Sequence, residues 1–412
     1  AHDFDVDPRS GFMPPEPPIA RLPTEWDEWE QVLDAALQSR LKIGENPDIS
    51  PEETERSRLW RETVSNMKIL DMGRLRNSER LLRRAHLVLT AILHIYVQTQ
   101  PSSPTPIVIP AAITVPVLAV SRELVLPPVL TYSDTVLYNW AYANKDSNEL
   151  KSLLLLSGTK DEEHFYLTSA YIELAGVEAL SLMRRCFDEA FVADSIALKR
   201  ITSYLKKLSS VIKRLTKILD AVRDGCDPKV FYNDIRPWFK GEDSGKRKWL
   251  FQDEHGNEVD FGSQRELSGP SAGQSSLIHA LDVFLGVDHT PQRPPAFLDR
   301  MQRYMPRHHR AFLVHLKAAP RPIRNLVSLN ATNGRDGSAS SLANAYDAAV
   351  LALKGLRDAH IRIATLYIIN QMPRPVQAAE PAARSVAKGT GGSDLVPFLK
   401  GSRDDTTRTL LN

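Results

Sequence analysis

Cysteine is scarce in this sequence of 412 residues, which contains only Cys186 and Cys226. Two cysteines are too few for the disulfide framework of a small secreted domain, and they lie too far apart in the sequence for a zinc knuckle. The low count excludes a disulfide-stabilised scaffold and fits a reducing compartment.

Long apolar runs and a strong net charge are also missing. The best candidate for a membrane span, residues 87–97, is far shorter than the roughly 18 apolar residues required, and it contains His94. Residues 1–5 lack the basic and apolar regions of a secretion signal. The formal net charge of +2 creates no strong field toward nucleic acid or an anionic membrane. We therefore expect a cytoplasmic protein that binds neither nucleic acid nor a membrane.

Several common catalytic motifs do not occur in the sequence. There is no His-Glu-x-x-His arrangement for zinc and no Gly-x-Ser-x-Gly turn for a nucleophilic serine. His308 and His309 are adjacent, so their side chains diverge on a helix and form no metal-binding pair. The sequence thus offers no standard zinc-hydrolase or serine-hydrolase site.

Prolines interrupt the sequence in two regions. The first 24 residues contain six of them and are expected to form an extended arm, because proline fixes φ and removes a backbone donor. Residues 101–128 contain seven prolines among β-branched residues, which predicts a long irregular connection with one short strand.

Helical periodicity covers most of the remaining chain. Residues 81–96 are apolar enough for a buried helix, and residues 201–222 carry an apolar stripe spaced by three and four, with Gly225 expected as a left-handed cap. Residues 240–270 are polar without periodicity and predict a surface loop. A last strong helix is expected over 341–369, before a tail of Pro, Ala and Gly at 374–395. The pattern indicates an all-α fold.

His360 falls on the apolar stripe of that last helix, in register with Leu353 and Leu356. One interpretation is a core histidine whose ring nitrogens are satisfied by hydrogen bonds. The other is an axial haem ligand, because a neutral imidazole on a rigid helix among small and aliphatic side chains leaves room for a flat macrocycle. Arg357, one turn earlier, is placed to meet a propionate or an internal carboxylate. The helix alone does not decide between them.

Arg236 lies in the aromatic segment Phe231-Tyr232-Asn233-Asp234-Ile235-Arg236-Pro237-Trp238-Phe239. Aromatic rings hold a planar apolar body, and a guanidinium binds a carboxylate in bidentate fashion, so the segment suits an amino-acid ligand. The alternative is a surface helix end in which Arg236 pairs with a nearby carboxylate such as Asp234.

Two glycine-containing segments complete the candidates. In residues 269–276, Ser271 is a candidate helix N-cap before residues 277–281, with Gly286 at the far end, and the small residues let a ligand approach the backbone. The segment Lys388-Gly389-Thr390-Gly391-Gly392-Ser393 lacks the Gly-Lys-Ser/Thr order of a phosphate loop, so a lid or a linker fits it better.

These segments, taken in order, resemble the indoleamine 2,3-dioxygenase family, and the resemblance spans nearly the whole chain. The matching segments are Gly11-Phe12-Met13-Pro14-Pro15-Glu16-Pro17, Leu126-Pro127-Pro128-Val129-Leu130-Thr131-Tyr132-Ser133-Asp134, Ser271-Ala272-Gly273-Gln274-Ser275-Ser276, Arg303-Tyr304-Met305-Pro306, Leu356-Arg357-Asp358-Ala359-His360 and Lys388-Gly389-Thr390-Gly391-Gly392. The sequence departs from the family pattern at Pro270, where a second glycine is frequent.

The resemblance implies haem b bound between a small N-terminal helical domain, residues 1–157, and a larger one, residues 158–412. It makes His360 the proximal iron ligand and Ser169 a residue that positions the substrate without transferring a proton. It implies substrate binding by Tyr132, Phe165, Ser169, Phe231, Arg236, Ala272, Gly273 and Thr390, and cofactor binding by Arg357, Asp282, Ser271 and Ala272.

The activity implied by the resemblance is insertion of both atoms of O2 across the indole C2–C3 bond of L-tryptophan, which yields N-formylkynurenine. Two alternatives stay open: a haem sensor of the same fold with weak catalysis, and a dioxygenase for another indole. Arg236 favours a substrate with a carboxylate in either enzyme. No extended interface stripe is visible, so a monomer is expected.

Overall fold

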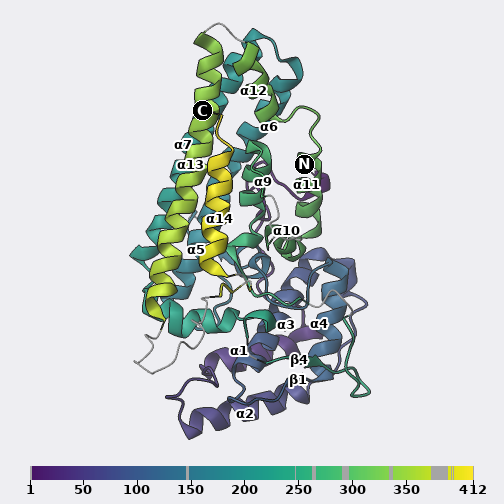
Figure 1. Ribbon diagram of the computed structural model, residues 1–412. Coiled ribbons are helices and arrows are strands. Elements are labelled where there is room, and N and C mark those ends of the chain that lie inside the picture. The colour runs from purple at the N-terminus through teal and green to yellow at the C-terminus, as the bar shows by residue number, and fades with distance from the viewer. Residues whose placement is uncertain are drawn as a thin grey trace.

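The protein is described here by a computed structural model that covers residues 2–144, 148–245, 247–261, 266–289, 297–333, 337–372, 388–390, 392 and 394–411. Within these residues helices dominate, which confirms the all-α fold class (Figure 1). The α-helices are α1 (Asp27–Gln38), α2 (Pro51–Ser65), α3 (Glu79–Gln98), α4 (Ala111–Leu124), α5 (Lys160–Ala175), α6 (Val177–Val192), α7 (Ser195–Asp220), α8 (Pro228–Val230), α9 (Ser276–Leu285), α10 (Phe297–Met301), α11 (Arg307–Lys317), α12 (Ile323–Asn333), α13 (Gly337–Tyr367) and α14 (Leu395–Arg408). The strands are β1 (Ile107–Ile109), β2 (Trp140–Tyr142), β3 (Leu150–Ser152) and β4 (Trp249–Phe251).

Helices α1 to α4 gather at one end of the molecule, at the bottom of Figure 1. Helix α3 is their centre, because every residue from Leu82 to Ile95 is buried. Ser78 begins α3 by accepting a hydrogen bond from the Leu81 amide. Near its start the guanidinium of Arg84 donates to both carboxylate oxygens of Glu30 at 2.8 and 2.6 Å, which pairs two buried charges.

The other end of the molecule is built on the long helices α7 and α13, which run side by side with α14 beside them (Figure 1). The predicted apolar stripe of residues 201–222 is buried along α7, from Ile201 to Leu215. Ser209 on α7 donates to the carbonyl of Ala348 on α13 at 3.0 Å. Helices α7 and α13 thus pack along each other, and α13 carries His360.

Residues 231–304 link the two ends of the molecule. Strand β4 pairs in parallel with β1, so residues 249–251 lie beside residues 107–109. Trp238 and Trp249 belong to the same apolar core as α3. The domain boundary at residue 157 remains a prediction, and residues well beyond it pack into the N-terminal core.

The expected irregular connection at 101–128 was wrong over half of its length. Its short strand is present as β1, but residues 111–124 form α4 despite Pro116 inside the helix. A proline in a helix costs about 3 kcal/mol. Each fully buried Ile, Val or Leu contributes roughly 1.5–3 kcal/mol, and Ile113, Val117 and Val120 are all fully buried, so packing outweighs the local penalty.

Three further predictions needed correction. Gly225 is not a left-handed cap, since its φ is −142°; a Cβ there would lie 2.6 Å from the His164 ring. Residues 240–270 are not wholly loop, because they contain β4. Ser271 caps a short 3-10 turn, and α9 begins only at Ser276. Gly286 ends this helix as expected, and its φ of 71° is left-handed.

The C-terminal region extends beyond the predicted helix. The helix expected over 341–369 is confirmed as α13, and α14 follows it without having been predicted. Of the expected tail, residues 373–387, Gly391 and Ser393 lie outside the described residues. No described helix combines the length and apolar character needed to cross a membrane.

Candidate active site

One cavity brings together most of the residues that the sequence singled out. Its volume is about 160 Å³, and it lies where α5, α13, α14 and the segments around residues 231–239 and 270–273 meet. The predicted residues that line it are Tyr132, Phe165, Ser169, Phe231, Arg236, Ser271, Ala272, Gly273, His360 and Thr390. Asp282 and Arg357 do not line it.

His360, the predicted iron ligand, lies on α13 at the wall of this cavity. Among the described residues its ring has no hydrogen-bond partner, unlike the core histidines His86 and His94. Burial and the nearby charge of Arg357 lower the pKa of His360 to about 4. The imidazole is therefore neutral at pH 7, which is the form that binds a metal.

Arg357 and Asp282 form a buried pair on the side of α13 near α9. One guanidinium nitrogen of Arg357 lies 2.7 Å from both carboxylate oxygens of Asp282, and the other two nitrogens donate to Ser402 and Thr406 on α14. Burial alone would raise the pKa of Asp282, but the charge of Arg357 and a hydrogen bond with His289 hold it at about 2. The pair therefore holds α9, α13 and α14 together.

Arg236 does not pair with Asp234, so the surface-pair alternative is wrong for these two described residues. Its Nη2 donates to the Lys388 carbonyl at 2.6 Å, and its guanidinium lies 5.6 Å from the centre of the Tyr232 ring. Its Nε is buried and has no partner among the described residues. Burial lowers the pKa of Arg236, since no carboxylate of the described residues offsets the cost of its charge. A ligand carboxylate would supply that missing counter-charge.

The local backbone explains how Arg236 and Phe231 reach the same cavity. Asp227 caps the first turn by accepting from the amides of Lys229 and Val230, and residues 231–235 then form a single π-helical turn. Such turns are frequent at functional sites because the extra residue redirects side chains. Phe231 packs 4.8 Å from the ring of Phe165, which makes an aromatic wall.

Glu173 was missed by the sequence analysis, although it supports Tyr132 in the wall of the cavity. It is 1% exposed, and one of its oxygens accepts from the Tyr132 hydroxyl at 2.9 Å and from the Ser275 hydroxyl at 2.7 Å. Its other oxygen is buried without a partner among the described residues. Burial raises the pKa of Glu173 to about 7, against the lowering effect of these two hydroxyls. The carboxyl group joins the Tyr132 segment to the start of α9.

We expect Glu173 to make folding stability depend on pH. Its pKa rises from 4.5 to about 7 on folding, so the native state binds the extra proton, and stability falls as the pH increases through this range. At about 1.4 kcal/mol per pKa unit the loss is roughly 3 kcal/mol at most. Thermal unfolding at pH 5 to 8 should show that Glu173→Gln flattens this slope, while the exposed Glu178→Gln leaves it unchanged. An equal slope in Glu173→Gln and the wild type would contradict the assignment.

The cover of the cavity comes from residues 388–390 and α14. The Thr390 hydroxyl donates to the Pro270 carbonyl at 2.6 Å, and the Gly269 amide donates to the Thr390 carbonyl at 3.2 Å. Phe398 on α14 packs 4.4 Å from the ring of Phe297. Leu395 and Leu399 also line the cavity. The aromatic and aliphatic residues of this cover were not predicted, because nothing local in the sequence shows that they face the site.

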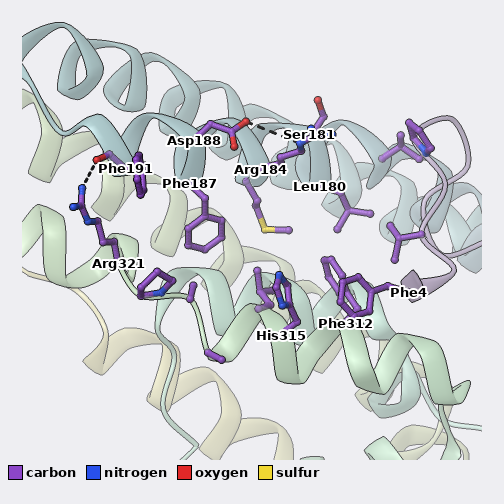
Figure 2. A pocket seen from close by; sticks show the side chains of 18 of the residues that line it. Phe4, Leu180, Ser181, Arg184, Phe187, Asp188, Phe191, Phe312, His315 and Arg321 are labelled. Carbon is purple, nitrogen blue, oxygen red and sulfur yellow. Dashed lines mark hydrogen bonds and ion pairs between the residues drawn. The ribbon is translucent and has the colours of Figure 1, made fainter. Parts of the chain in front are cut away.

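A larger cavity, of about 570 Å³, lies between α6 and α11 and contains none of the predicted site residues (Figure 2). Phe4 closes one end against Phe312, and Arg321 closes the other by donating to the carbonyls of Ala190 and Phe191. Its lining is mainly apolar. We therefore take the smaller cavity as the candidate site, because its lining includes His360 and Arg236.

Comparison with known proteins gives the family. A family model described as indoleamine 2,3-dioxygenase matches residues 1–409. The chain belongs to the indoleamine 2,3-dioxygenase family. It is 32% identical to indoleamine 2,3-dioxygenase of Saccharomyces cerevisiae over 98% of this chain and 92% of that protein. It is 30% identical to indoleamine 2,3-dioxygenase 1 of Rattus norvegicus, over 100% of this chain and 95% of the relative.

A further relative, the 6-hydroxytryptophan 2,3-dioxygenase of Fusarium equiseti, is 30% identical over 99% of this chain and 97% of its own length. As an indoleamine 2,3-dioxygenase family member, the chain is an oxidoreductase of the dioxygenase class, and the predicted family resemblance is confirmed.

Proposed function

We propose that this dioxygenase opens the indole ring of L-tryptophan with O2 to give N-formylkynurenine, using haem b held by His360. The observation that carries the proposal is the meeting, in one cavity, of a neutral histidine and a buried arginine whose ring and Nε, respectively, have no partner among the described residues. The first suits a metal and the second suits a carboxylate. Indoleamine 2,3-dioxygenases at about 30% identity support the substrate class.

The donors around the cavity fit haem b. His360 offers an imidazole, while Ala272, Gly273 and Ala364 are small and allow a flat group to approach. At about 160 Å³ the cavity is below the usual 300–1,000 Å³ of ligand pockets, so binding requires the cover formed by residues 388–390 and α14 to move outward. When bound, haem would supply the iron that activates O2 for attack on the indole.

The protein's own contribution is orientation and the exclusion of water. Arg236 would bind the tryptophan carboxylate, and the rings of Phe165 and Phe231 would hold the indole plane. Ser169 lies beside the Tyr132 hydroxyl and would position the substrate. Glu173 lies behind Tyr132 and does not line the cavity. In this proposal neither Glu173 nor Ser169 transfers a proton to the substrate. Fixing two reactants in one orientation is the main source of rate enhancement in this account.

A second candidate substrate is 6-hydroxytryptophan, on which one relative is named as acting. Arg236 would serve both substrates equally, since both carry the same carboxylate. The ratio of kcat/KM for the two compounds decides between them, and a ratio above one for L-tryptophan supports the proposal.

The proposal is tested by reducing the haem-loaded protein without oxygen, then adding L-tryptophan and O2 and following N-formylkynurenine by its near-ultraviolet absorbance. Multiple turnovers support the dioxygenase. A normal haem spectrum without product favours the haem-sensor alternative. The division at residue 157, the monomeric state and the cytoplasmic location remain predictions.

A further inference from the structure

His289 lies between two carboxylates that belong to different helices. Its Nε2 is 3.0 Å from Asp282 on α9, and its Nδ1 is 2.9 Å from Asp405 on α14. Its side chain is 18% exposed, and the two carboxylates are 5% and 15% exposed. The left-handed turn at Gly286 ends α9 and brings His289 back beside Asp282 on that helix.

The geometry requires a protonated ring. A neutral imidazole has one N–H and one lone pair, so one of its nitrogens would face a carboxylate with lone pairs on both sides. Only the imidazolium ion donates from both nitrogens at once. The contact of His289 with Asp282 and Asp405 is therefore an attraction when the ring carries a proton and partly a repulsion when it does not.

The contact fastens the C-terminal half of α14. Asp405 lies on this half, and so do Ser402 and Thr406, which accept from Arg357. The N-terminal half carries Leu395 and Phe398 into the candidate site. Helix α14 is thus anchored by charge at one end and covers the cavity with the other.

We propose that His289 is a positioning residue that fastens α14 to α9 when protonated and so holds the cover over the candidate site. Its effect on the substrate rests on the proposed function, whereas the fastening of α14 does not. His289 is not one of the residues that line the cavity, so it acts through α14.

The charged groups that face His289 together stabilise the imidazolium ion. Asp282 and Asp405 contact it directly, while Arg357 opposes its charge and Arg408 pairs with the other oxygen of Asp405. His279 lies on α9 close enough that the charge of His289 lowers its pKa. Burial lowers the pKa of His289, but the hydrogen bonds and charges of the two carboxylates raise it overall. The stabilisation is therefore fully present below the ordinary pKa of about 6.5 and is lost as the pH rises through the raised value.

Hydrogen exchange of the α14 amides tests the fastening in the protein as purified, without tryptophan. At pH 5.5 we expect protection factors in α14 to be about tenfold higher in the wild type than in His289→Gln, the effect of one charge-assisted hydrogen bond. At pH 8.5 the two proteins should agree. Asp405→Asn removes one carboxylate and should move the pH midpoint of the loss downward. The exposed His255→Gln is the matched control and should follow the wild type.

Equal protection of α14 in His289→Gln and the wild type at pH 5.5 would overturn the proposal, as would a wild-type profile without a pH midpoint.

Steady-state kinetics test the effect on the substrate. The KM of the wild type for L-tryptophan should rise with pH over the same range, with a smaller change in kcat. The KM of His289→Gln should not rise. A KM with the same pH dependence in His289→Gln and the wild type would overturn the link between α14 and the site. An absence of turnover with normal exchange profiles overturns the proposed function and leaves the fastening supported.

Discussion

Replacement of His360 by alanine should abolish haem retention. The residue lines the cavity with a neutral ring that no described group engages, so it is the one strong metal donor at this wall. The Soret band of the purified variant should fall almost to the level of protein without haem, because a haem iron without its proximal ligand is held only by contacts of the macrocycle.

Added imidazole should restore part of the Soret band in His360→Ala, since it fits the space that the side chain leaves. The exposed His255→Ala is the matched control and should keep the wild-type spectrum. A wild-type Soret band in His360→Ala would contradict the assignment of the iron ligand, and circular dichroism would show whether a loss of haem reflects unfolding instead.

Arg236→Ala should retain haem and lose most of its use of tryptophan. A hydrogen bond to a charged group contributes about 1.5–3 kcal/mol, which corresponds to a roughly 10- to 100-fold fall in kcat/KM. The Nε of Arg236 is buried without a partner in the described part of the chain, and the pKa of Arg236 is lowered; both indicate that the structure leaves this charge for a ligand.

Arg236→Lys should fall between the wild type and the alanine variant, because lysine keeps the charge but cannot bind a carboxylate in bidentate fashion. Arg214→Ala, at an exposed ion pair with Glu178, is the control and should not change kcat/KM. Steady-state kinetics with L-tryptophan, beside the same assay with an indole that lacks the carboxylate, separate the clamp from general damage. An equal loss for both compounds would exclude a carboxylate clamp.

The sequence predicted the helices around the site from local periodicity, and it predicted the lining residues from the motifs of the family. The stripe of α7 and the helix that carries His360 follow from helical periodicity, because each helix buries an apolar stripe in the core. The motifs of the family brought together residues as far apart as Tyr132 and Thr390, which line one cavity. Periodicity alone did not relate these segments to one another.

The parts that were missed depend on distant contacts. Helix α4 contains a proline that local rules read as a break, and burial against α3 overrides it. Glu173 looks like an ordinary polar residue of α5, and its burial arises from Tyr132 and Ser275, which lie 41 and 102 residues away in the sequence. His289 meets Asp405 across 116 residues. No local pattern encodes such pairs.

The most direct test of the proposed activity is turnover of L-tryptophan by the reduced, haem-loaded protein under ¹⁸O2, with mass spectrometry of the product. The account predicts N-formylkynurenine that contains two ¹⁸O atoms, one at each of the carbons that formed the indole C2–C3 bond, formed over many turnovers. A product with one labelled atom, or unchanged tryptophan beside an intact haem spectrum, would contradict it.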